Sequence, residues 1–179
     1  MNYNPLYLLV EGDDDERFFN KIIQPAIEGK YYPISIIKYA NMKKEKLEGW
    51  LASIKGYGAK YLFMTDFDVD RCITKTKQGT LQKAGNMDAD KIIVVKKEIE
   101  SWYLAGLCER DLRKFGIAPL DATDTITKEN FNQFISKKFS SRIDFMIETT
   151  KCFSVETAKS KNKSFSYFIG KLDRIQTPQ

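Results

Sequence analysis

Histidine is absent from the chain of 179 residues. Its absence excludes histidine-based catalytic triads, histidine-ligated metal centres and metalloproteases that carry an HExxH helix. Cysteine is scarce as well, because Cys72, Cys108 and Cys152 form an odd and widely spaced set that matches neither a disulfide framework nor a zinc signature. Acid–base chemistry must therefore come from aspartate, glutamate, lysine, tyrosine or a metal-bound water.

Long apolar runs are missing too. No run approaches the roughly 20 residues that span a bilayer, and the N-terminus lacks the basic segment, apolar segment and small-residue cleavage site of a signal peptide. We therefore expect no membrane association and a cytoplasmic location. The composition, 42% hydrophobic and 30% charged, is typical of a globular domain rather than of a disordered chain.

The net charge of +5 is concentrated near the end of the chain. Residues 1–136 carry 20 basic and 20 acidic side chains, whereas residues 137–179 carry 9 basic and 4 acidic ones. A basic element of this kind suits a polyanionic partner. The alternative is a solvated helix face with ordinary lysines.

Apolar patterning predicts alternating strands and helices over the first 107 residues. Continuous apolar runs predict strands, and apolar stripes at three- and four-residue spacing predict helices. The segment 71–89 is polar, and helix and loop fit it equally. The alternation predicts an α/β fold with a doubly wound, mainly parallel four-stranded sheet and helices on both faces. The expected strands are residues 6–10, 33–39, 60–65 and 91–95, and the expected helices are residues 15–27, 43–54 and 98–107.

The character of the sequence changes from about Pro119 onward. Helices are predicted over residues 127–139, 141–149 and 164–172, with no further strand between them. We therefore expect an α/β core over residues 1–118 and a helical C-terminal extension over residues 119–179. The extension is expected to pack on the core within a single domain.

A carboxylate ends the first predicted strand. Glu11 follows an apolar run, Gly12 allows a sharp turn, and a helix begins near Asp15. Ligands of open α/β sheets collect at the carboxyl ends of the strands, which makes Glu11 a candidate for a functional site. The alternative is a loop carboxylate close to the following helix dipole, and we expect Asp13 or Asp14 to cap that helix.

Three alternating aspartates end the third predicted strand. In extended backbone, Asp66, Asp68 and Asp70 share one face and can converge on one cation, and Mg²⁺ prefers such hard oxygen ligands. An EF-hand loop is excluded, because its sixth and twelfth positions would be Arg71 and Lys77 instead of glycine and glutamate. The alternative is three solvated loop aspartates.

Two further stretches are candidates for supporting roles. Glu98 and Glu100 follow the fourth predicted strand; in a helix they point about 200° apart, so one can face the strand ends while the other makes a surface ion pair. Lys159, Lys161 and Lys163 precede an aromatic helix, where lysines and a helix N-terminus can contact phosphates. The alternative for the lysines is a solvated turn between two helices.

These motifs together resemble the Toprim fold, over roughly residues 6–107. The more detailed resemblance is to small stand-alone Toprim-like proteins related to OLD-type nucleases and to bacterial defence proteins. Asp15 stands where the first motif of that group usually has glutamate. The matching stretches are Glu11-Gly12-x-x-Asp15, Asp66-x-Asp68, Glu98-x-Glu100-x-Trp102, and Ala158-Lys159-Ser160-Lys161 with Ser164-Phe165.

The resemblance implies Mg²⁺- or Mn²⁺-dependent hydrolysis of nucleic-acid phosphodiesters, with either DNA or RNA as the partner. On this hypothesis Glu11, Asp66 and Asp68 hold the main cation, and the candidates for a second cation or for supporting roles are Asp15, Asp70, Glu98 and Glu100. The residues expected to be catalytic are Glu11, Asp66, Asp68, Lys159 and Lys161. A topoisomerase or a complete primase is not expected, because the chain carries no recognisable cleavage, helicase or zinc module. The need for a protein partner or for self-association stays open.

Two other functions stay open at this stage. One is a non-catalytic module of a defence system that binds nucleic acid or a partner, and the other is a small-phosphate enzyme of the doubly wound class. The metal hypothesis makes a geometric prediction: Glu11 must lie within reach of a cation shared with Asp66 and Asp68.

Overall fold

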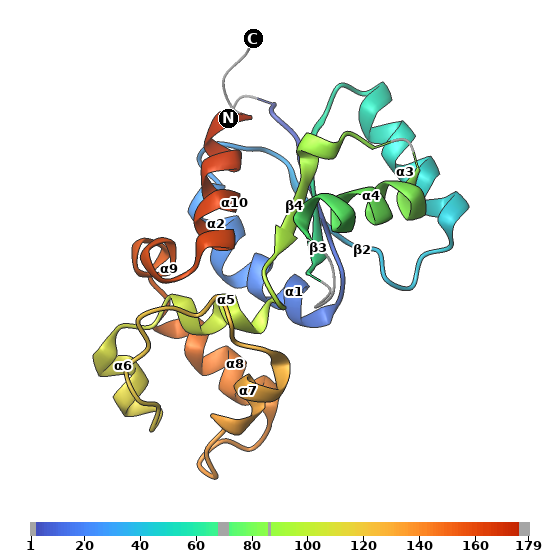
Figure 1. Cartoon of the computed structure of the whole chain (residues 1–179). Coiled ribbons are helices and arrows are strands. Elements are labelled where there is room, and N and C mark those ends of the chain that lie inside the picture. The colour runs from blue at the N-terminus through green and yellow to red at the C-terminus, as the bar shows by residue number, and fades with distance from the viewer. Residues whose placement is uncertain (1–2, 68–71, 86, 176–179) are drawn as a thin grey trace. The chain divides into compact units, whose positions relative to one another are not determined.

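The computed structural model describes residues 3–67, 72–85 and 87–175 (Figure 1). The chain divides between Val94 and Val95 into two compact units, which are described separately. The domain boundary expected near residue 118 stays a prediction. Asp68 and Asp70 lie outside the described residues.

The first unit is built on a four-stranded sheet of order β2-β1-β3-β4. The central strand β1 is parallel to both β2 and β3. The predicted α/β fold with a four-stranded parallel sheet is therefore confirmed. The strands are β1 (Leu6–Val10), β2 (Ile34–Lys38), β3 (Lys60–Asp66) and β4 (Ile92–Val95).

Strand β1 is apolar on both faces because the sheet is covered on both sides. Leu8, Leu9 and Val10 are fully buried, although successive side chains of a strand point to opposite faces. Leu9 pairs in register with Ile37 of β2 and Phe63 of β3, so these three side chains lie on one face of the sheet.

The Leu9 face is covered by α3 (Lys44–Gly56) and α4 (Ile73–Ala84). Leu47, Leu51 and Ile54 of α3 and Ala84 of α4 belong to one buried cluster with Leu9 and Phe63. In Figure 1, α1 and α2 lie on the other side of the sheet from α3 and α4. The polar segment for which helix and loop fitted equally is therefore largely helical, followed by a short 3₁₀ turn at Ala89–Lys91.

The helix expected over residues 15–27 begins earlier and contains a wider turn. It comprises α1 (Asp13–Phe18), a π-helical turn (Phe19–Ile23) and α2 (Gln24–Ile27). Pro25 has no N–H to donate and its ring crowds the preceding turn. The wider π turn accommodates the proline, so the helix continues past Pro25 instead of ending there.

The second unit is helical beyond β4. Helices α5, α8 and α10 correspond to expected helices, α7 is shorter than the expected residues 127–139, and α6 and α9 were not predicted. The last turn of α7 is closed by i→i+3 hydrogen bonds such as Phe134 N–H to Phe131 O, which mark its early end. The helices are α5 (Glu100–Ala105), α6 (Glu109–Lys114), α7 (Lys128–Gln133), α8 (Arg142–Lys151), α9 (Val155–Lys161) and α10 (Lys163–Arg174).

Aromatic side chains form the core of the second unit. Trp102 is fully buried, with its ring centroid 5.1 Å from that of Phe165 and 5.3 Å from that of Phe168. Phe131 of α7 and Phe145 of α8 pack with centroids 5.1 Å apart. The apolar faces predicted for these segments are therefore core.

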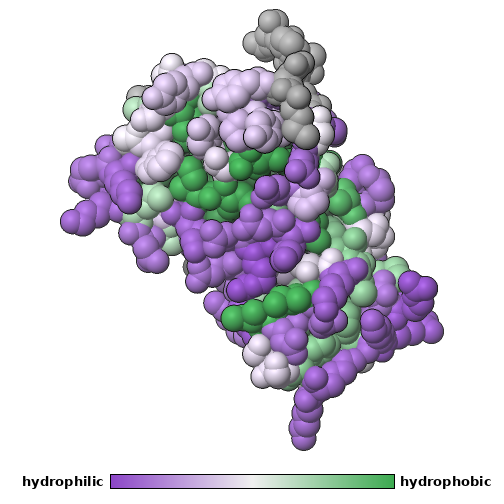
Figure 2. All heavy atoms as spheres, turned by 180° about the vertical axis from the view of Figure 1, so that it is seen from behind, coloured by the Kyte–Doolittle hydropathy of each residue, from purple (hydrophilic) through white to green (hydrophobic). Residues whose placement is uncertain are grey.

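Hydrophilic side chains cover much of the face shown in Figure 2, with apolar areas between them. Exposed large apolar side chains occur in both units, for example Tyr57 in the first and Ile143 in the second. Scattered exposure of this kind is normal for globular proteins. Within the described ranges, no helix has the length and apolar character required to cross a membrane.

Candidate functional site

The carboxyl ends of β1, β2 and β3 meet at one edge of the sheet. Val10 pairs with Lys38 and Leu9 pairs with Phe63. Continuing this register by one or two residues places Glu11 between Tyr39 and Thr65. Hydrogen bonds extend the β1–β2 pairing beyond the strands, because Tyr39 N–H donates to Val10 O at 3.0 Å.

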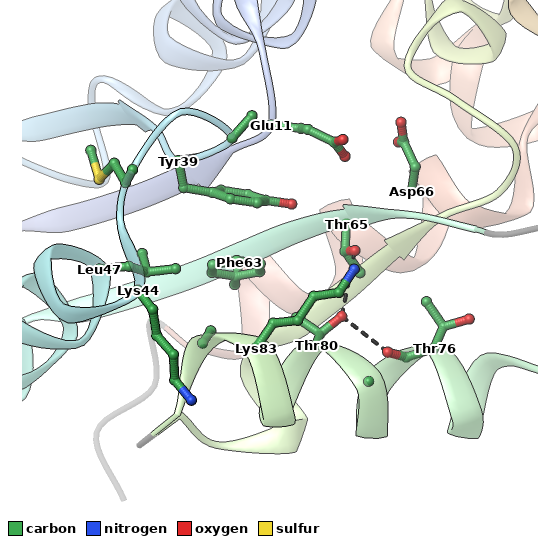
Figure 3. A pocket seen from close by; sticks show the side chains of 14 residues that line it. Glu11, Tyr39, Lys44, Leu47, Phe63, Thr65, Asp66, Thr76, Thr80 and Lys83 are labelled. Carbon is green, nitrogen blue, oxygen red and sulfur yellow. Dashed lines mark hydrogen bonds between the residues drawn. The ribbon is translucent and has the colours of Figure 1, made fainter.

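Glu11 and Asp66 line the same open pocket of about 550 Å³. Figure 3 shows both carboxylates on the same side of the pocket, next to the hydroxyl of Tyr39. The opposite wall is formed by α3 and α4. The other lining residues are Tyr39, Ala40, Met42, Lys44, Leu47, Phe63, Thr65, Thr76, Gly79, Thr80, Lys83 and Ala84.

The structure thus brings together two of the three residues in the geometric prediction. The third, Asp68, lies outside the described residues, as does Asp70. Among the side chains that are described, no group of three cysteines or carboxylates is placed to hold a metal ion. The metal roles of Glu11 and Asp66 stay predictions.

Tyr39 is a pocket residue that sequence reasoning missed. Its ring stacks on Phe63 with centroids 4.3 Å apart, and its hydroxyl donates to Met64 O at 2.8 Å. Burial raises the pKa of the Tyr39 hydroxyl, and the charges of Glu11, Asp66 and Asp15 raise this pKa further. The hydroxyl therefore stays protonated at neutral pH, within electrostatic reach of three carboxylates from the predicted metal site.

Tyr39→Phe is expected to lower the free energy of unfolding at neutral pH by roughly 1 to 2 kcal/mol, because the Met64 carbonyl loses its donor. The pKa of a phenol in the unfolded chain is about 10, and the pKa of Tyr39 in the folded protein is higher. Between these two pKa values the hydroxyl is protonated in the folded state and loses its proton on unfolding. The contribution of the hydroxyl to the free energy of unfolding therefore falls as the pH rises above about 10. The stability difference between wild type and variant should shrink above about pH 10. Urea unfolding at neutral pH and above about pH 10 measures this stability difference. A difference that does not change with pH would contradict the raised pKa of the Tyr39 hydroxyl.

Helix α1 begins after Gly12, and Asp15 contacts this N-cap residue, whereas a cap was expected from Asp13 or Asp14. The Asp15 Oδ2 accepts the N–H of Gly12 at 3.1 Å, and the side chain is buried. Asp13 instead pairs with Lys38 at 2.7 Å, and Asp14 pairs with Arg17 at 2.5 Å. The prediction of a cap at Asp13 or Asp14 was wrong. The partner of Asp13 lies in β2, and the partner of Asp14 lies one turn further along α1. A metal role for Asp15 stays a prediction.

Glu98 and Glu100 belong to the second unit, where each has a protein partner. Glu98 Oε2 accepts the N–H of Lys128 at 2.7 Å, at the start of α7. Glu100 is buried and forms an ion pair with Arg142. The ion pair foreseen for one of these glutamates is therefore buried rather than on the surface, and the metal roles of both stay predictions.

The candidate lysines of the second unit also have partners. Lys159 pairs with Glu156 at 3.0 Å, and the Lys161 ammonium donates to Leu107 O at 2.8 Å. Lys163 is the first residue of α10, and its N–H donates to Asp124 Oδ1 at 3.1 Å. Lys161 thereby links α9 to the segment after α5. The predicted phosphate contacts of Lys159 and Lys161 remain untested.

Asn162 is the centre of a buried hydrogen-bond network next to these lysines. Its Oδ1 caps α10 by accepting from Phe165 N–H at 3.0 Å, and it accepts from the Ser164 hydroxyl at 2.8 Å. Its Nδ2 donates to Thr123 Oγ1 at 3.0 Å, and the Trp102 indole N–H donates to Ser164 Oγ at 2.9 Å. The Ser164-Phe165 and Trp102 parts of the sequence motifs are therefore structural.

Asn162→Ala is expected to lower the free energy of unfolding by about 2 kcal/mol, because a helix cap is lost and buried partners are left unsatisfied. Thr127→Ala is the matched control, because the Thr127 hydroxyl caps α7 by accepting the N–H of Asn130 at 3.3 Å in an exposed hydrogen bond. Its expected loss is below about 1 kcal/mol. Equal losses for the two variants, measured by urea unfolding, would contradict the buried network.

Comparison with known proteins gives a small set of structural neighbours. No protein-family model matches the chain, and no curated protein matches it. Among solved structures, the C-terminal region of the Burkholderia pseudomallei OLD protein is similar, with 13% identity, a TM-score of 0.45 and 98% of each chain covered. The C-terminal region of the Xanthomonas campestris pv. campestris OLD protein has 15% identity and a TM-score of 0.44, covering 97% of this chain and 94% of that one.

Proposed function

We propose that the chain is a Mg²⁺- or Mn²⁺-dependent nuclease that hydrolyses phosphodiester bonds of DNA or RNA at the pocket lined by Glu11 and Asp66. The observation that carries this proposal is the meeting of two strand-end carboxylates in one open pocket. Carboxyl ends of parallel strands are where ligands of open α/β sheets bind.

The donor atoms at the pocket fit a hard divalent cation. Mg²⁺ commonly takes one or two protein carboxylates and completes its shell with water and phosphate oxygens. Glu11 and Asp66 supply two such carboxylates. The charge of Asp15 contributes to the raised pKa of the Tyr39 hydroxyl, so this third carboxylate lies close by. Glu11 and Asp66 would therefore hold the cation, and a bound cation would activate a water and neutralise charge on the phosphate.

The chain's own residues would position the substrate around these carboxylates. The Tyr39 hydroxyl donates a hydrogen bond to Met64 O, which links the segment after β2 to β3. Lys83 lines the same pocket from α4 and would offset negative charge that develops on the phosphate.

The proposal is tested with the full chain, purified and mixed with DNA and with RNA in Mg²⁺ or Mn²⁺. Cleavage in either metal that stops in EDTA is the expected result. Titration calorimetry of the protein with each metal gives a second readout that does not depend on cleavage. Absence of both cleavage and metal binding would overturn the proposal.

A second candidate is a non-catalytic module that binds nucleic acid or a partner, for example within a defence system. It is favoured by the protein contacts of Asp15, Glu98 and Glu100, which engage three of the predicted metal ligands. This module would bind nucleic acid in a salt-sensitive manner without affinity for Mg²⁺ or Mn²⁺. The same calorimetric titration distinguishes it from the nuclease.

A further inference from the structure

We propose that the pocket between the sheet and α4 is a subsite for one nucleotide, with its phosphate between Lys83 and the Glu11–Asp66 pair and its nucleoside towards Tyr39, Thr76 and Thr80. This inference rests on the proposed nuclease function and names the part of the substrate that the site recognises. The described residues that line the pocket all belong to the first unit.

The pocket has opposite charges on its two sides. Glu11 and Asp66 come from strand ends, whereas Lys83 comes from α4. In Figure 3 the Lys83 side chain points towards the strand end at Thr65, and the Lys44 side chain points away from the two carboxylates. Among the described residues Lys83 has no ion-pair or hydrogen-bond partner, so its ammonium is available to an anionic ligand.

The threonines of α4 favour a ligand that donates hydrogen bonds. The Thr76 hydroxyl donates to Cys72 O at 3.3 Å, and the Thr80 hydroxyl donates to Thr76 O at 3.0 Å. Each hydroxyl hydrogen is therefore engaged. The Thr80 oxygen also lies 3.5 Å from Thr65 Oγ1, and each of the two threonine oxygens keeps at least one lone pair for a donor. Sugar hydroxyls and base amino groups are such donors, whereas phosphate oxygens are not.

The remaining wall is apolar and partly aromatic. The stacked rings of Tyr39 and Phe63 line it together with Met42, Leu47 and Ala84. A volume of about 550 Å³ lies in the range of pockets that hold small ligands. A nucleotide has a part for each of these surfaces: a flat base for the apolar wall, hydrogen-bond donors for the threonine oxygens, and a phosphate for Lys83.

Charge predicts that two variants change nucleotide affinity in opposite directions. Without metal, Glu11 and Asp66 repel a phosphate and Lys83 attracts it. Binding of 5′-AMP in EDTA, measured by calorimetry or by NMR titration, is expected to weaken about tenfold in Lys83→Ala, because a charge-assisted hydrogen bond is lost. The same binding is expected to strengthen in Glu11→Gln, and Lys83→Arg is expected to restore most of the wild-type affinity.

Matched controls separate the subsite from general surface charge. Lys75 lies on α4 outside the pocket, so Lys75→Ala should leave AMP binding unchanged. Lys44 lines the pocket, but its ammonium lies 3.4 Å from Gln82 O, so Lys44→Ala should have a smaller effect than Lys83→Ala. Adenosine, which lacks the phosphate, should bind wild type and Lys83→Ala equally. Equal weakening of AMP binding by Lys75→Ala and Lys83→Ala would overturn the subsite.

A competition experiment identifies the source of the nucleotide. A short single-stranded oligonucleotide with a 5′-phosphate should displace AMP if the subsite serves a polynucleotide substrate. AMP binding that the oligonucleotide does not reduce would overturn that assignment. Because these titrations are done in EDTA, loss of the Lys83 effect refutes the subsite alone, whereas absence of cleavage in Mg²⁺ or Mn²⁺ with the Lys83 effect intact refutes only the nuclease.

Discussion

Glu11→Gln and Asp66→Asn are each expected to lower the rate of nucleic-acid cleavage by about 100-fold or more, because each removes a negative charge and an oxygen ligand from the proposed cation. Both residues line the same pocket. Both variants keep the size and shape of the side chain and replace one carboxylate oxygen by an NH2 group. The rate is measured at saturating Mg²⁺ and again with Mn²⁺. Metal affinity, measured by calorimetry, is expected to fall together with the rate.

The control for these variants is Glu45→Gln. Glu45 lies in the first turn of α3 and is exposed, and it is not among the residues that line the pocket. Its variant changes the net charge by the same amount and should cleave at the wild-type rate. Undiminished cleavage by Glu11→Gln, with metal affinity intact, would rule out the proposed carboxylate site.

The strand ends could be predicted because the signals are local. An apolar run followed by a carboxylate needs no knowledge of the remaining chain, and this signal identified Glu11 and Asp66. Tyr39 has no such signal, since its importance depends on β2 lying next to β1 in a particular register. Strand pairing between distant segments is not encoded in a short pattern.

Helix α4 was left undecided because its buried face is made of small side chains. Thr76, Thr80 and Ala84 recur every four residues and face the core, but none is a large apolar residue. A periodicity search for leucine, isoleucine or phenylalanine therefore misses the helix. The same small residues border the pocket. Their small side chains weaken the apolar pattern of the helix, and they also leave space for a ligand.

The Toprim-like motifs of the second unit illustrate a different difficulty. A glutamate or lysine within a motif can bind a metal or a phosphate, or it can stabilise the fold through contacts with other residues. The residue type alone does not distinguish these two roles. Glu98 accepts from the backbone of Lys128, and Lys161 donates to Leu107 O. These contacts join segments that are distant in the sequence, so no local pattern foretold them.

The buried pair of Glu100 and Arg142 predicts the largest effect on stability. Only 4% of the Glu100 side chain and 24% of the Arg142 side chain are exposed. Arg142 also donates to Asn132 Oδ1 at 3.0 Å, and its guanidinium lies 5.8 Å from the ring centroid of Phe131. Arg142 thereby connects α8 to α5 and α7.

Arg142→Met is expected to lower the free energy of unfolding by about 3 to 5 kcal/mol, because it leaves the Glu100 carboxylate buried without its ion-pair partner. The double variant Glu100→Leu with Arg142→Met should recover most of this loss, since apolar residues of similar volume can replace a buried ion pair. Arg110→Met is the control, because 90% of the Arg110 side chain is exposed. Urea unfolding measures all three variants. A double variant no more stable than Arg142→Met would show that Arg142 stabilises the unit through Phe131 and Asn132 rather than through Glu100.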